Sequence, residues 1–325
     1  MRALLDALRA AGEPSRLRLL AILARNELTV SELTRILGQS QPRVSRHLKL
    51  LCEAGLVDRH QEGTWVFYRV TDHGIAAEIA RSVISWISPD DSALGSDLER
   101  LESVCQEHAA AAAVYFRDNA KYWDRIRRLY VAESKVERAM ENAVSDMQID
   151  DLLDLGTGTG RVLEVFGSRI KRGLGIDLSR EMLAIARAHL ESVRLTHCQV
   201  RHGDIFHLPG MPASMDVVVI HHVLHFLDNP AQAVAAAART LKASGRLLIV
   251  DFAPHQLEFL RTEFAHRRLG FSDEEVRGWL NAAGLPFVST NHLTSRSGTS
   301  RKQLTVSVWC ASAMEIKTTT HQEAA

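Results

Sequence analysis

The sequence predicts two domains: an N-terminal α+β domain of helices with a β-hairpin, and a C-terminal α/β domain built on a mostly parallel sheet. The chain has 325 residues, more than a typical single domain contains. Residues 1–90 show helical periodicity that ends in two short strand patterns. From about residue 115 to 312, apolar runs alternate with helical patterns, which is typical of a doubly wound sheet. Residues 91–114 are expected to form a helical connector, and residues 313–325 a polar, disordered tail.

The composition excludes several classes of protein. With 39 basic and 39 acidic residues, the chain carries no overall charge that would draw it to nucleic acid or to a membrane, so any DNA contact must be local. No signal peptide and no membrane-spanning apolar run are apparent, so a cytoplasmic protein is expected. Neither a metal site nor a disulfide framework is expected, because the four cysteines are widely separated: Cys52, Cys105, Cys198 and Cys310.

The first domain has the order of elements of a winged helix. A short helix that Ser31 can cap is followed by a turn at Gly38 and Gln39, and a second helix is expected from about Gln41 to Glu53. Two strands around the turn at 61–64 then form a hairpin. A helix–turn–helix followed by a hairpin is a winged helix–turn–helix.

The second of these helices carries side chains suited to DNA. Arginine and glutamine can read base edges, whereas serine and lysine suit phosphates. The alternative is a solvated polar face, because residues 1–90 hold 12 basic and 10 acidic residues and so have only a weak positive excess. The winged-helix order of elements favours DNA binding. Together with two residues of the hairpin, the candidate DNA contacts are Gln41, Arg43, Ser45, Arg46, Lys49, Arg59 and His60.

The same domain closely resembles the ArsR family of bacterial repressors in three stretches: Gly12–Leu20, Ser40–Leu51 and Ala54–Val57. The resemblance implies a homodimer that binds double-stranded operator DNA with an inverted repeat. It also implies dimerisation through the first and last helices of the domain, here about Arg2–Ala10 and Asp72–Ile87. Many members sense metals through cysteines on the helix before the turn. Residues 27–33 contain no cysteine, so this role is not carried over, and His47 and Cys52 are interpreted as structural.

A glycine-rich loop follows the apolar run at 149–153 and precedes a predicted helix. In Asp154-Leu155-Gly156-Thr157-Gly158-Thr159-Gly160, three alternate glycines let the backbone turn sharply and approach a ligand. The dinucleotide-binding pattern would need a glycine at Arg161, so that pattern fails. An acidic residue followed by G-x-G-x-G instead resembles motif I of the class I S-adenosylmethionine-dependent methyltransferases. A glycine-rich turn of purely structural use is the alternative.

The methyltransferase resemblance implies a Rossmann-like α/β fold whose seven-stranded sheet closes with an antiparallel strand. Strands are expected at 150–155, 173–177, 197–201, 215–221, 245–251, 286–291 and 303–310. Helices are expected at 160–168, 180–191, 229–241 and 272–283. The aromatic stretch Tyr115–Asp124 resembles the cap helix of many small-molecule methyltransferases, which closes over the cofactor, or else it packs against the sheet.

Residues at successive strand ends are expected to bind S-adenosylmethionine or S-adenosylhomocysteine. The loop would hold the amino-acid part of the ligand, the carboxylate of Asp177 would accept both ribose hydroxyls, and Asp204 would accept from the adenine amino group. Met182 either packs on the adenine or is a core residue. The full set that the resemblance implies is Asp154, Gly156, Thr157, Gly158, Gly160, Asp177, Leu178, Met182, Asp204, Ile205 and His221.

Methyl transfer needs proximity and orientation, and it needs a base only when the acceptor carries a proton. His221 is the candidate catalytic base, with His222 and His225 behind it, although a histidine at a strand end is more often structural. No Asn-Pro-Pro-aromatic motif follows the fourth strand, which argues against methylation of nucleic-acid bases. Two later stretches resemble small-molecule methyltransferases of the ubiquinone/menaquinone type, and an acidic ligand group could be met there by His255, Arg267 and Arg268.

Two functions follow. The first is a transcription regulator whose methyltransferase-fold domain binds S-adenosylmethionine or S-adenosylhomocysteine as a signal, an architecture that resembles the SahR-type regulators of methionine and S-adenosylhomocysteine recycling. The second is an active small-molecule methyltransferase that carries a DNA-binding domain. A third and weaker hypothesis, DNA methylation, conflicts with the missing base-methylation motif. The sequence separates the first two poorly, because both need an intact cofactor site.

Overall fold

A computed structural model describes residues 1–62, 64–71, 74–88, 91–120, 132–208, 213–294 and 304–313. The chain divides into two compact units. The N-terminal unit comprises Met1–Ala112 together with Leu227–Asn229 and Gln256–Leu269. The C-terminal unit comprises the remaining residues from Ala113 onward. Two short segments from the second half of the sequence therefore belong to the first unit, which the sequence did not predict.

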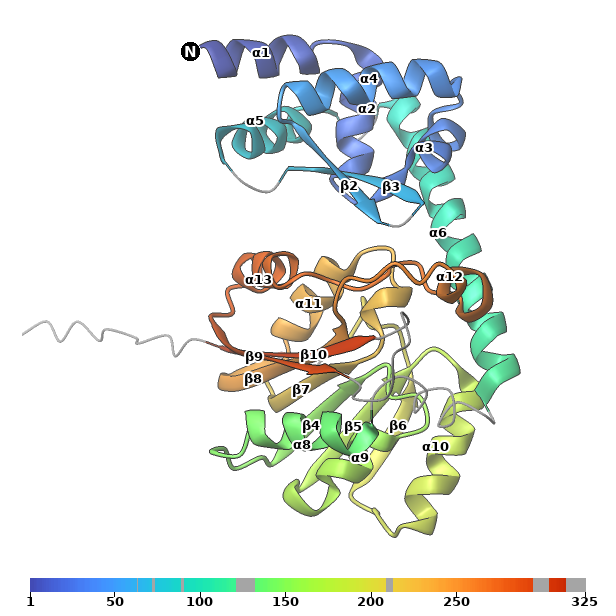
Figure 1. Ribbon diagram of the computed structural model, residues 1–325, viewed down its shortest axis with the longest axis vertical. Coiled ribbons are helices and arrows are strands. Elements are labelled where there is room, and N and C mark those ends of the chain that lie inside the picture. The colour runs from blue at the N-terminus through green and yellow to red at the C-terminus, as the bar shows by residue number, and fades with distance from the viewer. Residues whose placement is uncertain are drawn as a thin grey trace, which may run out of the picture. The chain divides into compact units, whose positions relative to one another are not determined.

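The N-terminal unit contains the predicted winged helix–turn–helix (Figure 1). Its elements are α1 (Arg2–Ala11), α2 (Pro14–Leu23), β1 (Leu28–Thr29), α3 (Val30–Leu37), α4 (Gln41–Glu53), β2 (Val57–Glu62), β3 (Trp65–Val70) and α5 (Gly74–Ser85). The strands form an antiparallel sheet in the order β1-β3-β2. Gly38 makes the turn between α3 and α4 in the left-handed conformation, with a φ of +64°, which glycine adopts without steric cost.

The prediction that Ser31 caps helix α3 is wrong. The N-cap is Thr29, whose hydroxyl accepts from the backbone N–H of Glu32. The carboxylate of Glu32 in turn accepts from the backbone N–H of Thr29 at 2.7 Å. This reciprocal capping box satisfies the backbone N–H groups of Thr29 and Glu32. Ser31 cannot be the cap, because the helix already begins at Val30.

Helix α6 (Ser92–Asn119) begins at the start of the expected helical connector, residues 91–114, and continues five residues beyond its end. Its first turns are anchored in the N-terminal unit through Asp97, whose side chain is fully buried. Arg18 donates two hydrogen bonds to the Asp97 carboxylate and Arg100 donates a third, at 2.5–2.6 Å. A buried carboxylate needs such partners to offset its loss of hydration. These hydrogen bonds fix the first turns of α6 to the N-terminal unit.

The C-terminal unit is built on the predicted seven-stranded sheet, in the order β6-β5-β4-β7-β8-β10-β9. The strands are β4 (Asp151–Leu155), β5 (Arg172–Asp177), β6 (Cys198–His202), β7 (Met215–His221), β8 (Leu241–Phe252), β9 (Phe287–Thr294) and β10 (Thr305–Ser312). The pairs among β4 to β8 are parallel, and β10 runs antiparallel to both of its neighbours. The expected antiparallel closing strand is therefore confirmed.

Helices cover both faces of this sheet, with α8, α9 and α10 on one face and α11 and α13 on the other (Figure 1). The bounds are α8 (Glu133–Ala143), α9 (Arg161–Phe166), α10 (Arg180–Ser192), α11 (Pro230–Ala238) and α13 (Asp273–Ala282). Short 3-10 turns lie at Gly167–Arg169 and Leu224–Phe226. Helix α12 (Phe259–Phe264) belongs to the N-terminal unit. Neither α8 nor α12 was expected.

One predicted boundary is wrong by several residues. The helix expected to reach residue 241 ends at Ala238, and Leu241 already begins strand β8. Leu241 pairs with Met215 of β7 and is 5% exposed. Burial against a neighbouring strand thus outweighs the helix propensity of the alanine-rich run.

Some predictions fall on residues outside those that the structure describes. These are the C-terminal part of the aromatic stretch, from residue 121, the glycine of the hairpin turn at 63, and the tail from residue 314. Among the described residues, no helix is long and apolar enough to cross a membrane.

Candidate functional site

The glycine loop lies at the carboxyl end of β4, between β5 and β7 in the sheet. The sheet reverses its order of connection here, and ligands of doubly wound folds bind at such a point. Gly156, Gly158 and Gly160 all have left-handed backbones, with φ values of +75°, +53° and +84°. A Cβ on Gly156 would lie 2.2 Å from Cγ2 of Val223. The loop therefore needs glycine at this position for both backbone and packing reasons.

Asp177, at the end of β5, braces this loop. Its Oδ2 accepts from the backbone N–H of Gly158 at 2.8 Å, and its Oδ1 accepts from the N–H of Ser179 at 2.8 Å. Burial raises the pKa of Asp177. Leu178 beside it is 57% exposed, although it is a large apolar residue. This pair suits a nucleoside, because the carboxylate of Asp177 can accept from the sugar hydroxyls and the exposed side chain of Leu178 can pack on the base.

The other predicted cofactor residues lie at the ends of neighbouring strands or on the helix after β5. Asp154 is fully buried within β4, and His221 ends β7 with its side chain half-buried. Asp204 follows β6 and accepts from the N–H of Phe206 at 2.9 Å, while Nδ1 of His207 lies 2.8 Å from its second oxygen. Ile205 and Met182 are 6% and 1% exposed. Because parallel strands end at one edge of the sheet, the topology brings these positions to that edge.

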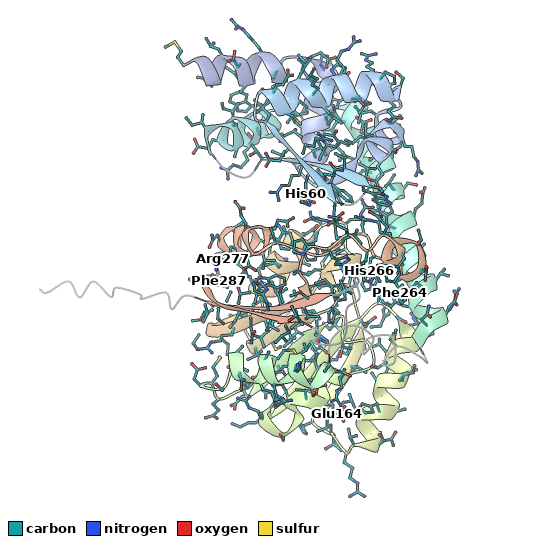
Figure 2. All side chains as sticks on the ribbon, viewed as in Figure 1. His60, Glu164, Phe264, His266, Arg277 and Phe287 are labelled. Carbon is teal, nitrogen blue, oxygen red and sulfur yellow. The ribbon has the colours of Figure 1, made fainter. Side chains whose placement is uncertain are left out.

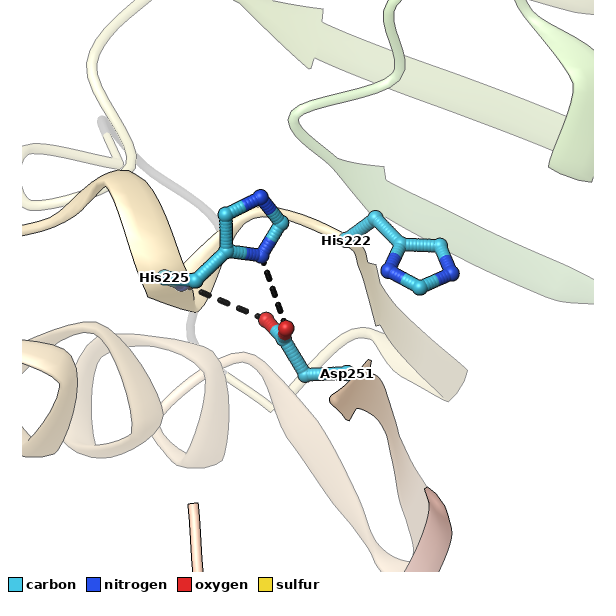
Figure 3. Close-up of side chains that lie close together, drawn as sticks. All are labelled: His222, His225 and Asp251. Atoms are coloured by element: carbon cyan, nitrogen blue, oxygen red, sulfur yellow. Dashed lines mark hydrogen bonds and ion pairs between the residues drawn. The ribbon is translucent and has the colours of Figure 1, made fainter. Parts of the chain in front are cut away.

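A polar cluster follows β7 and includes the end of β8. The sequence pointed to its histidines, His222 and His225, but not to Asp251. Nδ1 of His225 lies 2.7 Å from Oδ1 of Asp251, and these side chains are 2% and 0% exposed. His222 completes the cluster (Figure 3). Burial raises the pKa of Asp251 to about 6 and holds the pKa of His225 well below its ordinary value. The histidines were noticed in the sequence, but their partner lies 26 residues after His225.

The predicted DNA-contacting side chains lie on one surface of helix α4 and on strand β2. All five candidates on α4 are exposed, whereas Val44, His47, Leu48 and Leu51 are buried against the core. Arg59 and His60 are both exposed on β2, and His60 is labelled in Figure 2. His47 lies 3.6 Å from Glu13 in this core. The structure therefore separates a polar surface from an apolar one along α4, as a groove-reading helix requires.

Comparison with known proteins gives separate matches for the two parts of the chain. Residues 13–59 match the family described as bacterial regulatory protein, arsR family, and residues 153–249 match a methyltransferase domain. The arsenic resistance transcriptional regulator ArsR1 of Pseudomonas putida is 36% identical over 98 residues, which cover 28% of this chain and 77% of that protein. This chain belongs to the arsR family of bacterial regulatory proteins. It also carries a methyltransferase domain.

The relatives of the methyltransferase domain are more distant. The uncharacterised methyltransferase YcgJ of Bacillus subtilis is 29% identical over 104 residues, which cover 32% of this chain and 41% of that protein. A Haloferax volcanii methyltransferase, solved in complex with the Trm112 methyltransferase activator, aligns with a TM-score of 0.51 at 21% identity, over 61% of this chain and 97% of that one. This likeness shows the fold alone. This chain spans only 38–60% of the lengths of four curated relatives that it matches.

The segment Gln256–Leu269 of this ArsR-family chain supplies three arginines to the N-terminal unit. The side chains of Arg261, Arg267 and Arg268 are 4%, 6% and 2% exposed. Their guanidinium groups lie 5.3–5.7 Å from the centre of the Phe67 ring, and that of Arg261 lies 4.5 Å from Trp65. Cation–π contacts of this kind gain strength when water is excluded.

These arginines pair with carboxylates of the winged helix. Arg261 donates to Glu62 at 2.5 Å. Arg267 donates to Glu32 at 3.0 Å, and Arg268 donates to Glu27 at 2.6 Å and to Glu62 at 3.1 Å. The interpretation of Arg267 and Arg268 as contacts for an acidic ligand is therefore wrong, because buried glutamates already occupy both guanidinium groups. No local pattern in the sequence reveals pairs that are 199 to 241 residues apart.

Proposed function

We propose that this chain is an ArsR-type transcription regulator whose methyltransferase domain binds S-adenosylmethionine or S-adenosylhomocysteine as its signal. One observation carries the proposal. The two later segments of the N-terminal unit are Leu227–Asn229, which begins six residues after β7 ends at His221, and Gln256–Leu269, which begins four residues after β8 ends at Phe252. A change at the candidate cofactor edge therefore has a short covalent route to residues that contact the winged helix.

Ion pairs join both of these segments to the winged helix and to helix α6. Asp228 pairs with His108 and Arg267, and Arg267 pairs in turn with Glu32. Glu32 also closes the capping box of α3, the first helix of the helix–turn–helix. A ligand shifts DNA affinity only if it favours one of two conformations. Ligand binding that displaces the chain near residues 228 or 267 would act on α3 through these ion pairs.

DNA binding as a homodimer is supported by both surfaces of the winged helix. Helix α4 presents its polar residues to solvent, as described above. Helix α1 exposes Leu4, Leu5 and Leu8, which are 42–44% exposed in the single chain. Ile75 of α5 and Trp86 just after it are 65% and 76% exposed. Apolar side chains gathered on the first and last helices suit a symmetric interface between two copies.

The decisive experiment is a DNA-binding titration with the full chain. A duplex selected from random DNA by the protein itself serves as the operator, and S-adenosylmethionine and S-adenosylhomocysteine are added in turn. One of them should change the dissociation constant by about 5- to 150-fold, the usual range of allosteric coupling. If neither ligand changes it, the sensor hypothesis fails.

Two variants sharpen this test. Asp228→Asn should leave both separate affinities close to wild type and reduce the change caused by the ligand, because the pair with His108 loses its charge. Asp146→Asn is a matched control, since Asp146 forms an exposed pair with Arg246 in the C-terminal unit. It should leave the coupling intact.

A small-molecule methyltransferase is the second candidate, and the pair of His225 and Asp251 favours it. A carboxylate that accepts from Nδ1 orients an imidazole so that Nε2 can take a proton from an acceptor. The test is release of S-adenosylhomocysteine from S-adenosylmethionine in the presence of a low-molecular-weight cell extract. Many turnovers per chain favour the enzyme, whereas turnover no higher than in the extract alone excludes it for these acceptors.

Relatives of both parts bear names connected with arsenic, ArsR1 and an arsenite methyltransferase of Aquipseudomonas alcaligenes that is 30% identical over 160 residues. Arsenic(III) is a soft Lewis acid, and soft acids prefer sulfur ligands. Burial raises the pKa of both Cys198 and Cys310 to about 11 and that of Cys105 to about 12. Among the described residues, the one group of three potential metal ligands contains no cysteine, which does not favour an arsenic site.

A further inference from the structure

In the part of the chain that the structure describes, one group of three side chains has the composition of a transition-metal site. His222, His225 and Asp251 each offer one ligand atom, and these atoms lie within 4.8 Å of one another. All three belong to the C-terminal unit, at the ends of the adjacent parallel strands β7 and β8. Figure 3 shows His225, on the short turn after β7, hydrogen-bonded to Asp251, with the ring of His222 beside this pair. We infer that His222, His225 and Asp251 bind a divalent transition-metal ion of the zinc class.

The backbone at His222 is the first supporting observation. Its φ is +55°, a left-handed conformation that costs a non-glycine residue roughly 1 kcal/mol or more. Successive side chains of a continuing strand would point to opposite faces of the sheet. The left-handed residue breaks this alternation, and the ring centres of His221 and His222 lie only 4.7 Å apart. The left-handed backbone places the imidazole of His222 near Asp251. Backbone strain that a protein retains in this way often marks a functional site.

The spacing of the ligand atoms is the second observation. Zinc binds imidazole nitrogen and carboxylate oxygen at about 2.0–2.2 Å, so neighbouring ligand atoms in a tetrahedral site are separated by about 3.3–3.6 Å. His225 and Asp251 are already 2.7 Å apart and His222 lies within 4.8 Å of the group. Small rotations of the side chains would bring all three to coordinating distance. Two imidazoles and a carboxylate are the ligand set of open metal sites, with a further position left for water or a ligand.

The surroundings hold these ligands in place, as the outer shell of a metal site does. The carboxylate of Asp251 accepts from the backbone N–H of Phe252 at 2.8 Å and of His225 at 3.3 Å. The backbone N–H of His222 is tied to the carbonyl of Val250 at 2.8 Å. The ring of Phe252 lies 4.7 Å from that of His222 and 5.2 Å from that of His225. The packed ring of Phe252 limits the movement of both imidazoles, and the carboxylate of Asp251 supplies the negative charge that a bound cation needs.

This inference goes beyond the proposed function and does not depend on it. The site contains no residue of the winged helix, and it differs from the cysteine-based sites that the sequence excluded near the helix–turn–helix. It also needs no S-adenosylmethionine. Spacing alone could not predict it, because residues 222, 225 and 251 match no zinc motif in the sequence.

The test is metal binding by the full chain after removal of metals with a chelator. Equilibrium dialysis against zinc chloride should give one ion per chain, and cobalt chloride should give the visible absorption of a cobalt ion with nitrogen and oxygen ligands. His222→Ala and Asp251→Asn should each weaken zinc binding by at least about 100-fold, since changes in the outer shell alone cost about 10- to 100-fold.

His292→Ala is the matched control. His292 also pairs with an aspartate, Asp273 at 3.3 Å, and lies on β9 of the same unit. It should leave zinc affinity unchanged. If the fully buried Asp251 variant fails to fold, as judged by circular dichroism, the half-buried His222 variant decides. Absence of stoichiometric zinc in the wild type, or equal affinity in His222→Ala and His292→Ala, would overturn the inference.

Discussion

Nδ1 of His108 lies 2.8 Å from Oδ1 of Asp228, although the two residues are 120 positions apart in the sequence. Nε2 of the same imidazole lies 3.1 Å from Oε1 of Glu32. Burial of His108 disfavours its charged form, but the hydrogen bonds with Asp228 and Glu32 outweigh burial and raise the pKa of His108 to about 9. A protonated His108 therefore joins helix α6, helix α3 and the segment after β7 within the N-terminal unit.

His108→Gln should make the N-terminal unit less stable in a pH-dependent way. The folded pKa of about 9 exceeds the ordinary value of 6.5, so the contribution of His108 is fully present below pH 6.5 and is lost as pH rises through 9. The variant should unfold about 2 kcal/mol more easily at pH 6, by the usual worth of charged hydrogen bonds. Urea unfolding at several pH values measures this difference. Parallel pH profiles for the wild type and the variant would contradict the assignment.

Arg46→Ala should weaken DNA binding, because Arg46 is exposed at the polar surface of α4. A base contact predicts a loss of about 1–3 kcal/mol on the selected operator, with less effect on random DNA. If Arg46 contacts a phosphate, affinity should fall equally on the operator and on random DNA. The slope of log binding constant against log salt concentration should then become shallower by about one. Fluorescence anisotropy at several salt concentrations distinguishes the two. Affinity for S-adenosylmethionine should not change, and a loss of both affinities would argue against two separate binding modules.

Asp177→Ala should have the opposite effect and weaken S-adenosylmethionine binding without changing DNA affinity in its absence. The variant removes a charged acceptor for ribose and also the brace on the N–H of Gly158. Hydrogen bonds to charged groups contribute about 1.5–3 kcal/mol, so a loss of roughly 10- to 150-fold is expected by calorimetry. Asp216→Ala is a suitable comparison, because Asp216 accepts from backbone N–H groups at the other end of the sheet. Equal losses in both variants would point to general destabilisation.

Dimerisation can be tested separately from DNA binding. Leu8→Glu places a charge on the exposed apolar surface of α1, where Leu8 is 42% exposed. Burying an unpaired charge in an interface is strongly unfavourable, so the variant should sediment as a monomer where the wild type is a dimer. Val288→Glu, at a residue 48% exposed on β9, should leave the sedimentation unchanged. A wild type that is monomeric at every concentration would remove the basis of the dimer proposal.

Periodicity predicted most of the fold because most elements bury one face. The α4 boundaries, the glycine loop and the positions of most strands follow from local patterns, whereas the antiparallel closing strand was implied by the methyltransferase resemblance. The start of β8 at Leu241 does not, because residues 239–244 resemble the end of a helix. Only the pairing of Leu241 with Met215 of β7 places Leu241 in a strand, and the register then shifts so that Arg246 pairs with Val217.

Long-range ion pairs account for the main errors about function. Arg267 and Arg268 follow a strand end, where ligand contacts are common, so the sequence favoured a ligand for them. Their partners, Glu32 and Glu27, lie in the first domain, and nothing near them in the sequence indicates a buried guanidinium. The partner of His225 was hidden in the same way. Local sequence thus predicts a candidate site at the strand ends, whereas pairings across the fold determine what charged residues such as Arg267 and Arg268 contact.

Gly156→Ala should damage the cofactor loop more than its backbone conformation alone explains. Gly156 and Gly284 have almost equal φ values of +75° and +73°, but a Cβ at Gly156 meets Val223 at 2.2 Å and a Cβ at Gly284 meets nothing within 4 Å. Gly284→Ala should therefore cost only the left-handed strain, about 1–2 kcal/mol. Gly156→Ala should cost about 1–3 kcal/mol more from overpacking and should weaken S-adenosylmethionine binding. Thermal unfolding and calorimetry of both variants check this, and equal effects would show that the contact with Val223 does not constrain the loop.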